Sequence, residues 1–156
     1  MIYVSKTLPV NEAGALPLDR DQVWDGLVQK ASNALPFVPA MTHCQVLEQL
    51  DDLSFDREIE LRGQRLVERV VLEPKVRVSF TRIRGDVLGV IANEIEEDGD
   101  GALSLRFSYA LVLKGVAPGS DAEREYADGM AGDYLSALQA TLNAIRRVAS
   151  GETARL

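Results

Sequence analysis

Apolar and polar residues alternate with a period of two through the middle of the chain, a pattern typical of strands with one buried face. The alternation predicts six strands, at residues 43–50, 54–62, 65–73, 76–84, 88–97 and 102–114. An apolar and β-branched run predicts a first strand over residues 2–10. Turns with glycine or proline separate several of these segments, and short connections join antiparallel neighbours. We therefore expect an antiparallel meander of six to seven strands.

Helical periodicity occurs before and after the strand pattern. Asp19 and Gln22 match a capping box, and apolar residues at helical spacing follow them. Residues 35–41 are apolar but contain two prolines, which predicts a second, broken helical piece. Ser120 and Glu123 match another capping box at the start of a long helix. Its apolar stripe consists of Met130, Tyr134, Leu138, Leu142 and Ile145.

The long C-terminal helix is the only predicted element with the length to cover such a sheet. At 1.5 Å per residue it spans about 40 Å, the width of a small domain. A sheet with one buried face requires a cover. We therefore expect an α+β fold, in which a curved antiparallel sheet wraps around this helix and two short helices lie near the N-terminus. The length of 156 residues, without a visible linker, predicts a single domain over residues 1–156.

Hairpin loops determine which residues share the inner face of the sheet. A two-residue loop at Gly63-Gln64 places Arg57 and Glu68 on that face at diagonal positions. A loop of odd length at residues 73–75 adds Val76, Val78, Phe80 and Arg82. A loop at residues 99–101 aligns Ile91, Asn93 and Ile95 with Leu105, Phe107 and Tyr109.

The resulting inner face is apolar with five exceptions, which are Arg57, Glu68, Arg82, Asn93 and the hydroxyl of Tyr109. Buried charges must be paired or solvated. These residues therefore indicate a partly wet cavity inside the sheet. The alternative interpretation is an internal ion pair that joins the strands.

Charge and composition narrow the possible partners. The net charge of −7 argues against a nucleic-acid partner and against docking on anionic membranes. No apolar stretch approaches the roughly 18 residues of a spanning helix, and the N-terminus lacks the pattern of a signal peptide. The single cysteine, Cys44, excludes an intramolecular disulfide. We expect a cytoplasmic protein, as a monomer or homodimer.

Metal and nucleophile motifs are weak. His43 and Cys44 are adjacent in a predicted strand, so their side chains point to opposite faces and do not form a catalytic dyad. One histidine and one cysteine do not suffice for a typical zinc site. The acidic clusters lack the ligand spacing of a calcium loop. We expect neither a metal nor a cofactor.

The order of the predicted elements resembles the helix-grip superfamily, which includes START lipid-binding domains, the birch-pollen-allergen type of plant protein and polyketide cyclases. Shorter motifs are similar to the AtaL-like family, at residues 18–28, 37–41, 44–48, 56–59 and 67–70. The resemblance covers roughly residues 3–148. It implies the fold and the capacity for an apolar cavity. It implies no reaction, because members of the superfamily include carriers, receptors, cyclases and chaperone cofactors.

The leading hypothesis is the binding of a small, largely apolar or amphipathic organic molecule in an internal cavity. One alternative is an enzyme of the polyketide-cyclase or dehydratase kind, with Glu68 as general base. The other is a protein-interaction module whose core is filled by its own side chains. The predicted ligand-binding residues are Phe37, Met41, Arg57, Glu68, Phe80, Arg82, Asn93, Phe107, Tyr109, Met130, Tyr134 and Leu138.

Overall fold

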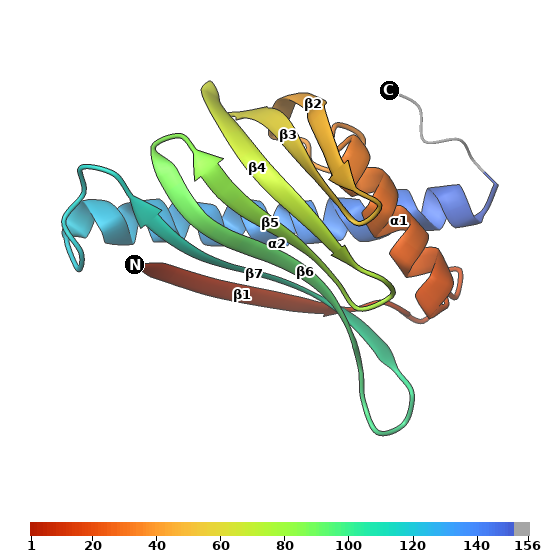
Figure 1. Cartoon of the computed structure of the whole chain (residues 1–156). Coiled ribbons are helices and arrows are strands. Elements are labelled where there is room, and N and C mark those ends of the chain that lie inside the picture. Colours follow the sequence, from red (N-terminus) through yellow and green to blue (C-terminus); the bar gives the residue numbers. More distant parts are fainter. Residues whose placement is uncertain (152–156) are drawn as a thin grey trace.

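The computed structural model describes residues 1–151 and contains one antiparallel sheet and two helices (Figure 1). The strands are β1 (Ile2–Pro9), β2 (Met41–Asp51), β3 (Ser54–Leu61), β4 (Gln64–Glu73), β5 (Arg77–Arg84), β6 (Val87–Glu97) and β7 (Leu103–Leu113). The helices are α1 (Arg20–Ser32) and α2 (Asp121–Ala149). The strand order is β1-β7-β6-β5-β4-β3-β2, so the meander from β2 to β7 is completed by β1 at one edge.

The long helix α2 lies along one side of the curved sheet, and α1 packs against it near the far end of the sheet from the N-terminus (Figure 1). The two helices approach closely at Gly26, where a Cβ atom would lie 2.3 Å from Cγ1 of Ile145. Glycine at this position therefore permits the contact between the helices. The predicted α+β architecture, a sheet wrapped around a C-terminal helix, is confirmed.

The prediction of two short helices near the N-terminus was wrong, because only α1 forms. In residues 35–41 the amides of Phe37 and Val38 both donate to the carbonyl of Ala34, each at 2.9 Å. Pro36 and Pro39 have no amide hydrogen to continue a helical ladder. The segment therefore forms isolated turns that lead into β2.

The two helix starts are capped differently. At α1, Asp19 and Gln22 form the complete capping box that the sequence predicted. At α2, the Ser120 side chain accepts from the amide of Glu123, as expected. The carboxylate of Glu123, however, accepts from the amide of Gly119 and the N-terminal ammonium of Met1, each at 3.1 Å. The charged N-terminus is a stronger partner than a backbone amide and anchors β1 to α2.

The predicted inner face of the sheet is largely correct, with two local corrections. The β3–β4 loop is Arg62-Gly63, both with positive φ, and not Gly63-Gln64. This shift keeps every side chain on its face but places Arg57 directly opposite Glu68. Val76 lies in the β4–β5 loop and is 47% exposed, so it is not part of the inner face.

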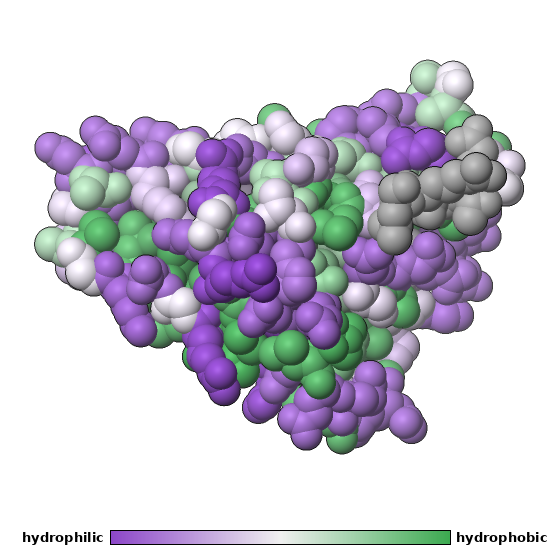
Figure 2. Space-filling view, turned by 90° about the horizontal axis from the view of Figure 1, so that it is seen from above, coloured by the Kyte–Doolittle hydropathy of each residue, from purple (hydrophilic) through white to green (hydrophobic). Residues whose placement is uncertain are grey.

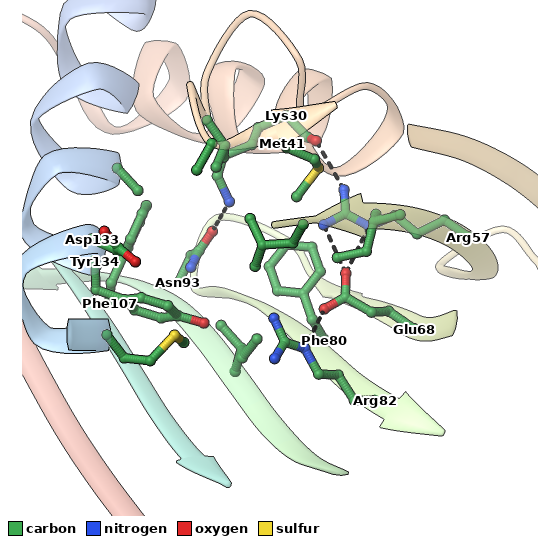
Figure 3. Close-up of a pocket in the computed structure, with 17 residues that line it drawn as sticks. Lys30, Met41, Arg57, Glu68, Phe80, Arg82, Asn93, Phe107, Asp133 and Tyr134 are labelled. Atoms are coloured by element: carbon green, nitrogen blue, oxygen red, sulfur yellow. Dashed lines mark hydrogen bonds and ion pairs between the residues drawn. The ribbon is translucent and has the colours of Figure 1, made fainter. Parts of the chain in front are cut away.

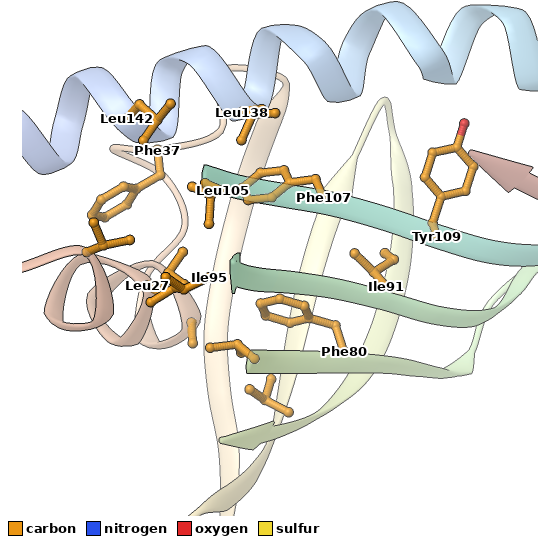
Figure 4. Close-up of a cluster of buried hydrophobic side chains, with 14 of the residues drawn as sticks. Leu27, Phe37, Phe80, Ile91, Ile95, Leu105, Phe107, Tyr109, Leu138 and Leu142 are labelled. Atoms are coloured by element: carbon orange, nitrogen blue, oxygen red, sulfur yellow. The ribbon is translucent and has the colours of Figure 1, made fainter. Parts of the chain in front are cut away.

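The β6–β7 pairing follows the prediction, since Ile91 pairs with Tyr109, Asn93 with Phe107 and Ile95 with Leu105. These apolar side chains, with others from β5 and both helices, form the core between the sheet and α2 (Figure 4). The surface seen from above is mostly hydrophilic, with apolar patches between the polar side chains (Figure 2). Among residues 1–151, neither helix is long and apolar enough to cross a membrane.

Candidate functional site

A cavity of about 70 Å³ lies between the inner face of the sheet and the middle of α2 (Figure 3). The end of α1 and the start of β2 close it on one side. A single water molecule requires about 15 Å³ by the same measure, so several would fit. Nine of the predicted binding residues lie on its wall, namely Met41, Arg57, Glu68, Phe80, Arg82, Asn93, Phe107, Met130 and Tyr134. Phe37, Tyr109 and Leu138 are buried in the core and do not line it.

Three charged side chains from neighbouring strands form one buried cluster on the cavity wall. Arg57 on β3 contacts one oxygen of Glu68 through Nε at 3.0 Å and Nη2 at 2.9 Å. Arg82 on β5 donates through Nε to the other oxygen at 3.3 Å. All three are at most 4% exposed. The predicted cavity and the predicted ion pair are therefore both present, and the ion pair lines the cavity.

The electrostatics of Glu68 follow from this arrangement. Burial alone would raise the pKa of Glu68, but the adjacent guanidinium groups of Arg57 and Arg82 outweigh it, so the pKa lies below its usual value. Arg57 also donates to the carbonyl oxygens of Lys30 and Ala31, at 3.2 and 2.9 Å. These carbonyls belong to the last turn of α1 and have no partner within the helix. Arg57 thus connects the sheet to the end of α1.

Lys30, which the sequence analysis missed, also points into the cavity (Figure 3). Its Nζ donates to Oδ1 of Asn93 at 2.8 Å and lies 4.9 and 5.0 Å from the ring centres of Phe80 and Phe107. Burial, reinforced by Arg57 and only partly offset by Glu68, lowers the pKa of Lys30 to about 7. Within residues 1–151 no carboxylate lies within ion-pair distance of this amine.

A signal for Lys30 was present in the sequence. Counting from Val23, the positions i, i+4, i+7 and i+8 of the first helix are Val23, Leu27, Lys30 and Ala31. Lysine at such a position usually extends its ammonium to solvent along the apolar surface. Here the facing sheet provides Asn93 as a buried acceptor, which only the tertiary structure reveals.

The cavity wall presents hydrogen-bond donors that the described part of the chain leaves free. Arg82 uses only Nε in hydrogen bonds with residues 1–151, and Asn93 uses only its oxygen. The hydroxyl of Tyr134 points from α2 into the cavity (Figure 3). Burial raises the pKa of the Tyr134 hydroxyl above its usual value, so it is a protonated donor at neutral pH. Apart from these residues, Lys30, the Arg57–Glu68 pair and Asp133, the wall is apolar and aromatic.

A second hollow, of about 220 Å³, lies between the β3–β4 turn and the first half of α2. It shares four lining side chains with the cavity, namely Leu61, Arg82, Met130 and Asp133. Asp133 also forms an ion pair with Arg62 of the β3–β4 turn. The two hollows are therefore adjacent, and their combined volume approaches the roughly 300 Å³ of small ligand pockets.

Other potential chemistry in the described residues lies outside the cavity or is absent. Nε2 of His43 is 3.2 Å from Glu58, while Sγ of Cys44 is near the backbone amide of Ala34 and the guanidinium of Arg57. The two neighbouring side chains thus have different partners, as expected for a strand. No group of three or more histidine, cysteine, aspartate or glutamate side chains within residues 1–151 is placed to hold a metal ion.

Comparison with known proteins identifies the fold. The family model described as "AtaL: Acetylaranotin biosynthesis cluster protein L" matches residues 4–151. A search of curated proteins finds no match.

Three solved structures share this fold. The Zhui aromatase/cyclase from Streptomyces sp. R1128 is 19% identical with a TM-score of 0.75, over 97% of this chain and 98% of that one. A START superfamily protein from Mycobacterium smegmatis is 15% identical with a TM-score of 0.64, over 95% and 99%. Ara h 8.0201 is 12% identical with a TM-score of 0.62, over 92% and 96%. At these identities the likeness shows the fold, which is the helix-grip fold that the sequence predicted.

Proposed function

The chain belongs to the AtaL family, and we propose that it binds a small amphipathic organic molecule, with an apolar skeleton and acceptor oxygen atoms, in the cavity described above. The observation that carries this proposal is the set of free donors on a wall that is mostly apolar. The Nη atoms of Arg82, the amide nitrogen of Asn93 and the hydroxyl of Tyr134 all have hydrogens to donate.

The charge of the site favours carbonyl, phenolate or carboxylate oxygens in the ligand. Arg57 and Arg82 carry two positive charges against the single negative charge of Glu68. Lys30 adds a further positive charge when it is protonated. A buried site with excess positive charge favours ligand atoms of negative or partly negative charge. The aromatic side chains Phe80 and Phe107 favour a flat, unsaturated skeleton beside those oxygens.

The size of the cavity supports a container over a protein-interaction module with a filled core. About 70 Å³ exceeds the space of one or two water molecules. It is smaller than the roughly 300–1,000 Å³ that drug-sized ligands require. We therefore propose that a ligand of more than a few atoms displaces Met130 and extends into the neighbouring hollow. Methionine is the most adaptable apolar side chain for such a movement.

A matched ligand series tests the proposal. Naphthalene, 1-naphthol and 1-naphthoate share one skeleton and differ in their acceptor oxygens. We expect 1-naphthol and 1-naphthoate to bind and raise the melting temperature, and naphthalene to bind at least about tenfold more weakly, as loss of a hydrogen bond to a charged donor predicts. Isothermal titration calorimetry measures the affinities. Equal affinities for all three compounds, or no binding at all, would contradict the proposal.

Two arginine variants on β5 test whether Arg82 causes the preference for oxygenated ligands. Arg82→Met removes the charged one of the free donors, whereas Arg84→Met changes an exposed arginine two residues along β5. We expect the first variant to lose much of the preference for the oxygenated compounds and the second to keep it. Binding is measured well below the melting temperature of each variant, because Arg82→Met also removes one partner of Glu68.

A second candidate function is catalysis on a carbonyl compound, of the cyclase or dehydratase kind. The fold likeness to an aromatase/cyclase favours it, and the same donors would stabilise an enolate oxygen. The geometry does not favour Glu68 as the base, since both of its oxygens accept from arginines and its pKa is lowered. The test is turnover of an aromatic β-diketone, followed by mass spectrometry, for wild type and Glu68→Gln. Loss of turnover with retained binding would assign the base to Glu68.

A further inference from the structure

We propose that Lys30 is a reactive amine, which forms an imine with a carbonyl group of the molecule in the cavity. This inference rests on the proposed function, because it requires a carbonyl ligand in the same cavity. Lys30 is not needed to compensate Glu68, because the Arg57 and Arg82 guanidinium groups already do so.

The position of Lys30 suits an amine that meets a ligand. It projects from the last turn of α1, is 5% exposed and lines the cavity. A single hydrogen bond, to Asn93, holds the Nζ atom, which leaves its other positions free for a ligand. The ring centres of Phe80 and Phe107 lie 4.9 and 5.0 Å from Nζ on the same cavity wall, so the amine meets the ligand in apolar surroundings.

The charges around Lys30 favour the neutral amine. The ionisable groups that face it or the same cavity come from five elements, namely Cys44 on β2, Arg57 on β3, Glu68 on β4, Arg82 on β5, and Asp133 and Tyr134 on α2. Glu68 already lies between two guanidinium groups, and Asp133 pairs with Arg62. With a pKa of about 7, roughly half of the Lys30 side chains carry a free lone pair at neutral pH. A desolvated lysine near another cation is the usual form of a nucleophilic lysine.

The chemistry needs only the amine, the carbonyl group and one proton from solvent. The lone pair of Nζ attacks the carbonyl carbon, a C–N bond forms, and the carbonyl π electrons move to the oxygen, which takes up the proton that the nitrogen releases. The hydroxyl of this carbinolamine then takes up the proton from solvent, the nitrogen lone pair forms the C=N bond as the C–O bond breaks, water leaves, and a protonated imine remains. The free donors of Arg82 and Tyr134 lie on the same cavity wall, where they would stabilise the oxygen as its charge develops.

Reductive trapping tests the inference on the intact protein. Propanal, with cyanoborohydride as reductant, converts each imine to a stable propylamine that peptide mapping locates. The chain has four lysines, and Lys6, Lys75 and Lys114 are all more exposed than Lys30, so they are internal controls. At pH 7 we expect Lys30 to be modified at least about tenfold faster than the others, because an ordinary lysine is almost fully protonated there. Modification of Lys30 should slow between pH 8 and pH 5.5.

Two further measurements separate this inference from the proposed function. Excess 1-naphthol, which has no carbonyl group, should protect Lys30 by occupying the cavity. Lys30→Arg cannot form an imine, so residue 30 should no longer be trapped, while Lys6, Lys75 and Lys114 should be modified at the same rates as in the wild type. If 1-naphthol binds but Lys30 is modified no faster than the exposed lysines, the inference fails and the proposed function stands. If Lys30 is trapped while the naphthalene series does not bind, the proposed function fails and the reactive amine stands.

Discussion

The two halves of α2 contact the same sheet in different ways. In the C-terminal half, Leu138, Leu142 and Ile145 are fully buried among apolar side chains from α1 and the sheet, with Phe37 beneath Leu142 (Figure 4). In the N-terminal half, Met130 and Tyr134 face a cavity (Figure 3). Both halves present a similar apolar stripe, so the difference arises in what faces them, which is α1 for the C-terminal half and a charged part of the sheet for the N-terminal half.

The sheet opposite the N-terminal half contains three adjacent charged side chains that satisfy one another. Arg57, Glu68 and Arg82 occupy paired positions on β3, β4 and β5, and their charged groups are held by one another and, for Arg57, by the end of α1. They line the cavity and do not fill the space beneath α2, as apolar side chains of similar volume would. Charges that pair within a sheet thus produce a cavity under a helix that is otherwise suited to a packed core.

The largest effect should come from breaking this cluster. Glu68→Gln leaves Arg57 and Arg82 buried without a counter-charge, so we expect the free energy of unfolding to fall by about 3–5 kcal/mol. Urea denaturation at pH 7 measures it. The matched control is Glu58→Gln on the outer face of β3, whose surface ion pair with Arg65 contributes at most about 1 kcal/mol. Equal losses in the two variants would show that the inner cluster has no special energetic role.

A pair of alanines one heptad apart on α2 compares a position on the cavity with a position in the packed core. Ala144 is 1% exposed in the packed half, and Ala137 lines the cavity. We expect Ala144→Leu to reduce the free energy of unfolding by about 1–3 kcal/mol through overpacking. Ala137→Leu should change it by less than about 0.5 kcal/mol, because the added atoms enter existing space. Ala137→Leu should also weaken 1-naphthol binding, because the added atoms occupy the cavity. Unchanged binding by Ala137→Leu would mean that the ligand binds outside this cavity.

The buried amine makes the cavity half sensitive to pH. Because the pKa of Lys30 is lowered to about 7 in the folded protein, the unfolded chain binds more protons between pH 7 and its unperturbed value of 10.5. The contribution of Lys30 to stability therefore rises with pH in that window, by at most about 1.4 kcal/mol per pH unit, and is constant below it.

Lys30→Met isolates this contribution, because all other groups cancel in the difference from wild type. We expect the variant to be relatively more stable at pH 6 and to lose that advantage as the pH rises to 9. Urea denaturation of both proteins at several pH values measures the difference. A difference that does not vary with pH would mean that Lys30 is charged throughout the range.

Much of this architecture was predictable because each step depended on local rules. The alternation of apolar and polar residues predicted the strands, and the odd or even lengths of the hairpin loops predicted the inner face. The loop at Gly63 was misplaced by one residue, but this error moved the pairing by two positions and left every side chain on its predicted face. Arg57, Glu68, Arg82 and Asn93 were therefore placed correctly inside.

The features that were missed depend on contacts between elements. The second N-terminal helix was predicted from apolar content, although two prolines remove the amides that it needs. Lys30 was overlooked because its burial depends on an acceptor on β6, more than sixty residues away. Phe37, Tyr109 and Leu138 are on the inside but do not line the cavity. This depends on how side chains of different volume pack together, which the spacing of apolar residues in the sequence does not reveal.

The smallest effects are expected for substitutions of Tyr109 and Tyr134, whose ring centres are 4.3 Å apart. The hydroxyl of Tyr109 is buried with no partner in the described residues, and burial raises its pKa to about 12. The hydroxyl of Tyr134 faces the cavity. Tyr109→Phe should therefore stabilise the fold by up to about 1 kcal/mol without affecting 1-naphthol binding.

Tyr134→Phe should leave the melting temperature nearly unchanged but weaken 1-naphthol binding about 3–10-fold, the size of one neutral hydrogen bond. Calorimetric titration and thermal unfolding of both variants give the comparison. If Tyr109→Phe were the variant that weakened binding, the ligand would lie on the far side of the tyrosine pair, toward the N-terminal end of α2. Because the rings of Tyr109 and Tyr134 are in contact, that result would move the expected position of the ligand by one side chain and would leave the fold unchanged.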